Sequence, residues 1–91
     1  MFKFEWDEQK AASNLQKHGV SFDEAVSVFA DDLALTFADS EHFESEERSR
    51  TYGISNKGRL IVLVHTERRL NIRIISARKA TRYEKSIYDK G

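Results

Sequence analysis

The fold is decided by residues 48–77, which read RSRTYGISNKGRLIVLVHTERRLNIRIISA. Three β-like segments, at 48–55, 59–66 and 70–77, are separated by the short turns NKG and ERR. Turns of this length join neighbouring antiparallel strands, so this stretch predicts a three-stranded meander. The run LIVLV at 60–64 lacks the alternation of a half-buried strand, which predicts a central strand covered on both faces.

The N-terminal segment predicts a strand and a helix. FKFEW at 2–6 alternates apolar and charged residues, which is the period of a half-buried strand. Asp7 is placed to cap a helix that extends to His18, and Gly19 favours a left-handed stop after it. Ala11, Leu15 and His18 fall on one side of this helix.

A second helix is predicted to start after Ser21. SFDE at 21–24 fits a capping box, in which the Ser21 side chain accepts a hydrogen bond from the Glu24 amide and the Glu24 side chain reaches back. The apolar residues of its expected core face have helical spacing. They are Phe22, Ala25, Val26 and Phe29.

The remaining segments complete an α+β domain in the order βααββββα. LALTFA at 33–38 is a further strand by composition, and the acidic DSEHFESEE at 39–47 is expected to be a solvated loop. A last helix is expected over about 79–89. The side chains that it is expected to bury are Ala80, Tyr83 and Ile87. We therefore expect one compact domain over 1–91, an antiparallel sheet packed by helices.

Composition indicates a soluble globular protein. The chain has 91 residues, 40% hydrophobic and 33% charged, and no apolar run approaches the ~20 residues that span a bilayer. Residues 1–20 carry acidic groups where a signal peptide would be apolar, and there is no cysteine for a disulfide or a thiolate zinc site. We expect a cytoplasmic protein without membrane contact.

The formal net charge of zero hides a segregation of charge along the chain. Residues 1–56 have five Lys/Arg against twelve Asp/Glu, a net charge of −7, whereas residues 57–91 have ten against three, a net charge of +7. Either the two halves neutralise each other in the folded protein, or the second half forms a basic surface for an anionic partner such as a nucleic-acid backbone.

The residue inventory excludes several classes of site. The three histidines are scattered over a helix end, a loop and a strand, so neither a metal site nor another cofactor is expected. No glycine-rich phosphate loop or nucleophile elbow is present. What remains is a basic cluster around RIISARKATRYE at 73–84, with a few groups able to carry protons. These groups are His65, Glu46, Glu84 and the tyrosines.

This inventory suits metal-independent RNA cleavage, in which the 2′-hydroxyl of the substrate attacks its own adjacent phosphate. Arginine stays charged and grips two phosphate oxygens with its planar fork, which stabilises the developing charge. Each candidate also has a structural interpretation. Arg73 can be a surface ion pair, His65 a structural strand residue, and Glu84 the partner of Thr81 in a capping box.

The chain resembles the BrnT family of bacterial toxins over almost its whole length. The matching stretches are FEWD at 4–7, KHGVSFDEA at 17–25, VFAD at 28–31 and RIISARKA at 73–80. Single residues that also match are Lys10, Asn14, Glu47, Arg48, Gly53, Glu84 and Tyr88.

The resemblance implies a fold similar to the RelE-type ribonucleases and a ribonuclease toxin that stops translation and arrests growth. It also implies a BrnA-type antitoxin, which holds the toxin inactive in a hetero-oligomer and supplies the contacts to operator DNA. By position, Arg78 and Arg82 look like the functional arginines of the family, with Arg48 as a third. We add His65 as a proton carrier from the residue inventory. The expected RNA-backbone contacts are Arg73, Lys79, Lys85 and Arg59.

Two other functions stay open from the sequence alone. The basic residues also suit a non-catalytic module that binds RNA or an acidic protein segment. A toxin relative that has lost activity also stays open, although the retention of Arg48, Arg78 and Arg82 favours an active one. A DNA-binding regulator fits less well, because the second helix carries Asp23 and Glu24 and no cation.

Overall fold

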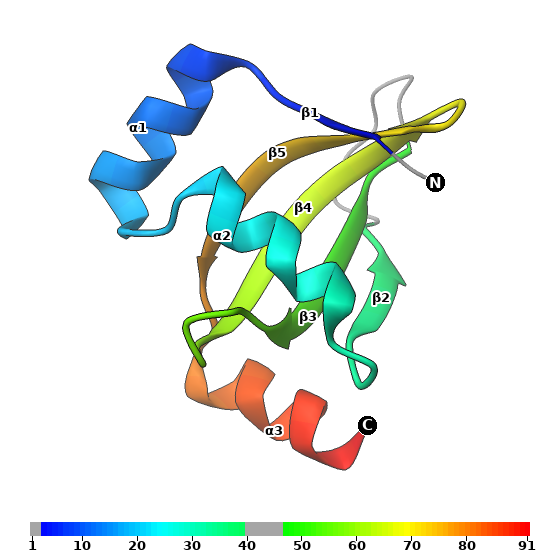
Figure 1. The fold of residues 1–91 in the computed structure, drawn as a ribbon. Helices are drawn as coiled ribbons and strands as arrows, with labels where there is room; N and C mark the ends of the chain where they lie inside the picture. The colour runs from blue at the N-terminus through cyan, green and yellow to red at the C-terminus, as the bar shows by residue number, and fades with distance from the viewer. Residues whose placement is uncertain (1–2, 40–46) are drawn as a thin grey trace.

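The computed structural model describes residues 3–39 and 47–91, which form three α-helices, a short 3-10 helix and a five-stranded sheet (Figure 1). In chain order the elements are β1 (Lys3–Glu5), α1 (Glu8–His18), α2 (Phe22–Val26), η1 (Ser27–Ala30), β2 (Leu35–Ala38), β3 (Ser49–Ile54), β4 (Leu60–Arg68), β5 (Asn71–Lys79) and α3 (Arg82–Lys90). The predicted order βααββββα omits η1, which directly extends α2. Residues 1–2 of the first predicted strand and 40–46 of the predicted acidic loop lie outside the described residues.

The strand order is β1–β5–β4–β3–β2, so β4 lies in the middle of the sheet. β4 pairs antiparallel with β3 and with β5, as the meander predicted. Ile61, Val62 and Leu63 are each at most 2% exposed, so both faces of this strand are covered. The prediction of a central strand at LIVLV is therefore confirmed.

The prediction of an antiparallel sheet is wrong at one edge. β1 pairs in parallel with β5, with Phe4 opposite Ile72, and the sheet is therefore mixed. The alternation over 2–6 identifies a strand but does not specify its neighbour. That neighbour comes from the other end of the chain, and only tertiary packing brings the two together.

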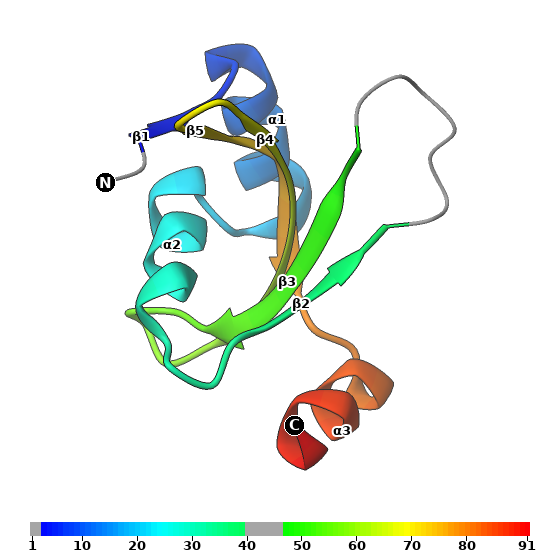
Figure 2. The same ribbon diagram turned by 90° about the vertical axis from the view of Figure 1, so that its right-hand side faces the viewer.

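Figure 2 shows α1 and α2 on one face of the sheet and α3 at one end of the opposite face. The hydrophobic core lies between the sheet and α1/α2. Its buried residues are Val20, Phe22, Ala25, Val28, Ile61, Leu63, Ile72, Ile74 and Ala77. The core is extended by aromatic contacts such as that between Trp6 and Phe22, whose ring centroids are 5.9 Å apart.

α1 is capped by Asp7 and stopped by Gly19 as predicted, and the residue that it buries is Asn14. Leu15 is 50% exposed, whereas Asn14 is buried. The Asn14 amide donates to the Ala77 carbonyl at 2.8 Å and accepts from the Ala77 amide at 3.1 Å. Hydrogen bonds therefore tie α1 to β5, and a hydrophobic pattern does not reveal them.

α2 has only half of the predicted capping box. The Ser21 side chain accepts from the Glu24 amide at 3.0 Å, but the Glu24 carboxylate does not reach back to close the box. It binds Arg59 and Ser55 instead. The guanidinium of Arg59 donates to both Glu24 oxygens, and such a bidentate pair of opposite charges is among the strong hydrogen-bonded contacts, which accounts for the side chain leaving its own helix.

α3 begins at Arg82, later than predicted, because β5 extends to Lys79. The capping box between Thr81 and Glu84 is complete. Tyr83 was expected to be buried but is 74% exposed. Glu84 is the one residue of this helix that is buried, so the attachment of α3 to the sheet is mainly polar.

Candidate functional site

Four of the eight predicted site residues line one concavity beside α3. It has a volume of about 350 Å³ and lies where the start of β4 and the end of β5 meet the first turn of α3. The Ala80 amide donates to the Leu60 carbonyl at 3.0 Å, which holds the two strand ends together. The lining residues, which define what we call the basic pocket, are Arg59, Leu60, Lys79, Ala80, Thr81, Arg82 and Lys85.

Two of the four cations of the basic pocket are already paired. Arg59 donates through Nε to Glu24 Oε2 at 2.9 Å, and its Nη2 also binds Glu24 Oε1. This contact lowers the pKa of Glu24 and raises the pKa of Arg59. Lys85 Nζ lies 2.8 Å from Asp89 Oδ2, one helical turn further along α3. Both pairs reduce the positive charge that these two residues can offer to a ligand.

The other two cations of the basic pocket are Lys79 and Arg82. Within residues 3–39 and 47–91 they form no side-chain hydrogen bond or ion pair. Unpaired cations in a concavity concentrate field lines and raise the local concentration of anions. Lys79 and Arg82 are therefore the groups best placed to bind a phosphate.

Arg78 is held by a carboxylate of its own chain and does not line the basic pocket. Its Nη1 and Nη2 donate to Glu84 Oε1 and Oε2 at 2.7 and 2.8 Å. Glu84 Oε1 also accepts from the Thr81 amide at 2.9 Å, and Arg78 is the main cause that lowers the pKa of Glu84 to about 2. The resemblance implied a functional role for Arg78, and in the structure the anion beside Arg78 is Glu84.

A second polar contact holds the C-terminal half of α3. The Tyr88 hydroxyl donates to Asp31 Oδ2 at 2.6 Å, and Asp31 also accepts from the amides of Ile54 and Leu33 at 2.8 and 3.0 Å. These hydrogen bonds lower the pKa of Asp31, and the Asp31 contact raises the pKa of Tyr88 to about 12. Sequence reasoning missed this pair, because residues so far apart in the chain have no common local pattern.

His65 lies in the core, on the face of the sheet covered by α2 and η1. It is 2% exposed, its Nε2 lies 2.7 Å from Thr51 Oγ1, and its ring meets that of Phe29 at 5.1 Å. Burial lowers the pKa of His65, so the neutral imidazole is favoured. His65 therefore does not line the basic pocket, and its role as a proton carrier stays a prediction from the residue inventory.

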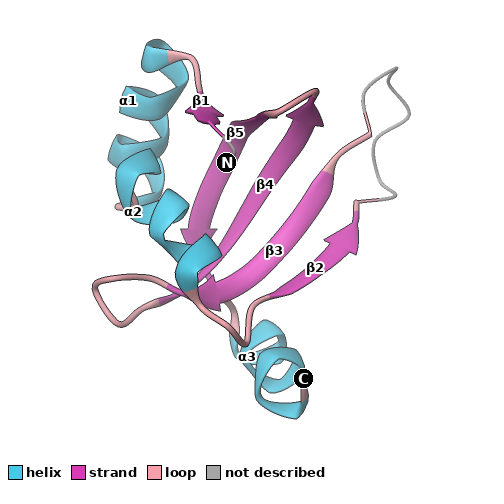
Figure 3. Cartoon of the chain, turned by 45° about the vertical axis from the view of Figure 1, so that its right-hand side comes forward, coloured by secondary structure: helices cyan, strands magenta, loops and turns pink. Residues whose placement is uncertain are grey.

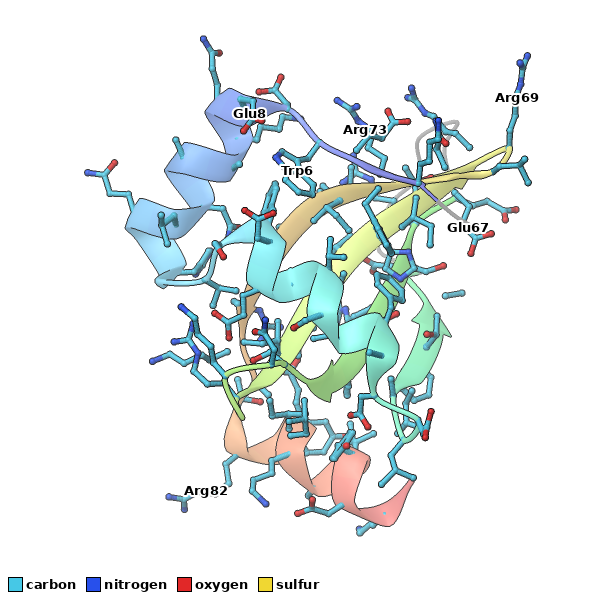
Figure 4. The ribbon with its side chains drawn as sticks, in the orientation of Figure 1. Trp6, Glu8, Glu67, Arg69, Arg73 and Arg82 are labelled. Atoms are coloured by element: carbon cyan, nitrogen blue, oxygen red, sulfur yellow. The ribbon has the colours of Figure 1, made fainter. Side chains whose placement is uncertain are left out.

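Arg48 and Arg73 lie at the end of the sheet away from α3. Arg73 Nη1 is 3.1 Å from Glu5 Oε2, and Figure 4 shows Arg73 and Arg82 at opposite ends of the molecule. Arg48 directly precedes β3, and its Nε is buried without a hydrogen-bond partner among the described residues. These two arginines are therefore too distant to hold the same phosphate as the basic pocket.

The described residues offer few groups for proton transfer at the basic pocket. None of its lining residues is an Asp, Glu, His or Tyr, so of the common general acids and bases only lysine lines it. In the part of the chain that the structure describes, no three His, Cys, Asp or Glu side chains gather as a metal site requires. No helix there is long and apolar enough to cross a membrane.

Comparisons with known proteins give a family and a related structure. Residues 6–84 match the family described as "Ribonuclease toxin, BrnT, of type II toxin-antitoxin system". A search of curated proteins found no match. The chain is similar to the crystal structure of the Brucella abortus ribonuclease toxin, BrnT, with a TM-score of 0.69 and 24% sequence identity, over 90% of this chain and 100% of that chain. At this identity the likeness shows a shared fold.

Proposed function

Because the chain belongs to the BrnT family of ribonuclease toxins from type II toxin–antitoxin systems, we propose that it is a metal-independent endoribonuclease that stops translation and arrests growth. We propose that it acts in the cytoplasm, without a cofactor, as a single domain over residues 1–91 with a RelE-like fold. Family membership implies an antitoxin, which we propose to be of the BrnA type and to supply the contacts to operator DNA.

One observation supports the basic pocket as the place of the reaction. Lys79 and Arg82 line a concavity, and neither has an acidic partner within the described residues. Phosphate groups dominate the affinity of proteins for nucleic acids, and cations supply that affinity. The apolar side chains of Leu60 and Ala80 lie in the same concavity, where they lower the local dielectric and strengthen the attraction.

In the proposed reaction the 2′-oxygen of the RNA attacks the adjacent phosphorus while the bond from phosphorus to the 5′-oxygen breaks. The 2′-hydroxyl loses a proton to water and the leaving 5′-oxygen gains one from water, so the products are a 2′,3′-cyclic phosphate and a 5′-hydroxyl end. Negative charge develops on the nonbridging oxygens. Lys79 and Arg82 stabilise that charge, which is the kind of interaction that contributes most to many enzymatic rates.

We assign Arg78 a positioning role in this reaction. It holds Glu84, and Glu84 binds the amide of Thr81, so the first turn of α3 is fixed against the sheet. Arg82 belongs to that turn. Arg48 and Arg73 are proposed contacts to RNA nucleotides that flank the cleaved bond.

The test compares the wild type with Arg82→Glu and with Lys90→Glu, a matched charge reversal at an exposed position of the same helix. Arg82→Glu is expected to reduce RNA cleavage about 100-fold or more and to abolish growth arrest, with an unchanged thermal melt. Lys90→Glu is expected to keep both activities. A folded Arg82→Glu protein that still cleaves RNA and arrests growth would remove the basic pocket from the mechanism.

Because no Asp, Glu, His or Tyr lines the basic pocket, one other function is favoured, a module that binds RNA without cutting it. Such a module would retain RNA affinity with a steep dependence on salt, because it displaces counterions from phosphates. The two functions differ in one measurement. Purified wild-type protein that binds RNA but leaves its length unchanged over hours would support the binding module or an inactive toxin relative.

A further inference from the structure

β2 is an outer strand of the sheet, with β3 as its neighbour in the strand order (Figure 3). Natural proteins usually protect such an edge with charged residues, proline or bulges, because its unpaired backbone groups invite another strand. β2 reads LTFA and contains neither charge nor proline, whereas β1 at the opposite edge carries Lys3 and Glu5. Thr36, Phe37 and Ala38 are exposed.

The hydrogen-bond pattern shows which backbone groups of β2 face outward. The Asp39 amide donates to the Arg48 carbonyl at 2.8 Å, so these two residues form a hydrogen-bonded pair with β3. Such pairs alternate along an antiparallel ladder, and Thr36 and Ala38 therefore turn their N–H and C=O groups away from β3. The 2.8 Å contact between the Thr36 and Thr51 hydroxyls agrees, because side chains lie closer in a non-hydrogen-bonded pair.

A hollow with apolar and acidic lining residues lies at the start of β2, with a volume of about 270 Å³. Leu33, Ala34, Leu35 and Tyr88 contribute its apolar lining, and Asp32 and Asp89 contribute carboxylates. Leu33 is 70% exposed and Phe37 on β2 is 46% exposed. Large apolar side chains exposed together, beside acidic groups and an unprotected strand edge, are typical of a protein-binding surface.

The charge around this edge selects the kind of partner. Residues 31–39, which include β2, contain Asp31, Asp32 and Asp39 and no Lys or Arg. The cation nearest in the register, Arg50 of β3 opposite Phe37, is paired with Asp39. Pairing of two β2 edges from two copies of the chain would bring two acidic segments together, and that is unfavourable. A partner segment that carries Lys or Arg would instead gain from the same charges.

We propose that the outer edge of β2 and the hollow beside it are the docking site for an extended segment of the antitoxin, in which an apolar side chain is flanked by Lys or Arg. The segment adds a strand to the sheet through the outward groups of Thr36 and Ala38, and its apolar side chain fills the hollow. Its cations face Asp32. The identity of this partner rests on the proposed function, but the surface shares no residue with the basic pocket.

Two pairs of variants test this docking site, with the purified protein encoded beside the toxin gene as the probe in titration calorimetry. Ala38→Pro removes an outward N–H but leaves the ladder to β3 intact, and Ala38→Ser keeps the N–H. Phe37→Lys places a positive charge at the edge, which repels a cationic segment, and Leu70→Lys makes the same change at a 72% exposed residue that precedes β5. The first variant of each pair is expected to bind the probe about tenfold more weakly than the wild type, or more weakly still. The second variant is expected to bind it as tightly as the wild type.

Several outcomes would overturn the inference. Folded Ala38→Pro and Phe37→Lys proteins that bind the probe as tightly as the wild type would overturn it. A wild type that does not bind the probe would overturn it as well. A dimer of the toxin alone that Ala38→Pro dissociates would assign the edge to a second copy. Loss of binding in Arg82→Glu alone would place the antitoxin on the basic pocket.

Amide hydrogen exchange on the wild-type complex keeps the test decisive if Ala38→Pro does not fold. Exchange at the amides of Thr36 and Ala38 is expected to slow about tenfold or more on binding, and unchanged exchange would overturn the inference. RNA cleavage by the free protein, measured on the same preparations, tests the proposed function separately. A protein that does not cleave RNA, but whose binding to the probe depends on Ala38, would refute the ribonuclease proposal and support the docking surface.

Discussion

α2 and α3 are both short helices, but they are attached to the sheet in different ways. α2 places Phe22 in the core, whereas the one buried residue of α3 is Glu84. α3 is held by the pair between Arg78 and Glu84 and by the hydrogen bond from Tyr88 to Asp31. Apolar burial is non-directional and independent of pH, while polar contacts fix an orientation and respond to pH. α2 therefore contributes mainly stability, and α3 mainly orients the cations of the basic pocket.

The largest expected effect is on the α2 side. Phe22→Ala removes a fully buried ring and leaves a cavity, so we expect the free energy of unfolding in urea to fall by about 3–5 kcal/mol. That is a large share of the total stability of a domain of this size, and partial unfolding at 37 °C is expected. The matched change on α3, Tyr83→Ala, removes a ring that is 74% exposed and should cost less than about 0.5 kcal/mol. If the two variants lost the same free energy of unfolding, α2 and α3 would not differ in how much apolar burial stabilises them.

An intermediate effect is expected from acid on the α3 side. The pKa of Glu84 is about 2 rather than 4.5, because Arg78 stabilises its charged form. The folded-state pKa lies below the unfolded-state value, so this stabilisation is complete above pH 4.5 and is lost as the pH falls toward 2. We expect a loss of about 2 kcal/mol across that window, after a reduction for the partial exposure of Arg78.

Urea unfolding of the wild type and of Glu84→Gln at several pH values measures this loss. The difference in stability between the two proteins is expected to shrink from pH 5 to pH 2.5. Glu67→Gln, at an exposed position of β4, serves as the control and should follow the wild type. A difference that stays constant with pH would show that the ion pair does not hold α3.

The smallest expected effect concerns the far end of α3. Tyr88→Phe removes only the hydroxyl that binds Asp31, and we expect a stability loss of about 1 kcal/mol. Amide hydrogen exchange is expected to quicken in α3 but not in α2, because the hydrogen bond holds α3 alone. Tyr83→Phe, an exposed tyrosine of the same helix, should change neither quantity. Faster exchange in both helices would indicate that they move as one unit.

Much of the fold follows from local patterns in the chain. The unbroken apolar run at 60–64 predicted a central strand, and the structure places that run in the middle of the sheet. Asp7 and Gly19 predicted the ends of α1, because the cap and the left-handed stop depend on neighbouring residues alone. The parallel pairing of β1 with β5 had no such local signal, and neither had the burial of Asn14.

The sequence predicted that the candidate site is basic, but it did not predict which of the basic residues lie together. The sequence predicted a basic cluster after RIISAR, and the structure gathers Arg59, Lys79, Arg82 and Lys85 in one pocket. It also separates residues that sequence reasoning had grouped. Successive side chains of a strand point to opposite faces of the sheet. Whether a strand residue such as His65 faces the core or the solvent therefore depends on the register of its strand.

Local patterns in the sequence therefore determined where helices and strands begin and which strand is central. Composition determined that the second half of the chain is basic. Tertiary structure alone decided which cations stay unpaired. Arg78 and Arg59 meet Glu84 and Glu24, whereas Lys79 meets no carboxylate within the described residues. The physical reason is that charge pairing depends on distances of a few ångströms between side chains, and for Arg59 and Glu24 only folding sets such a distance.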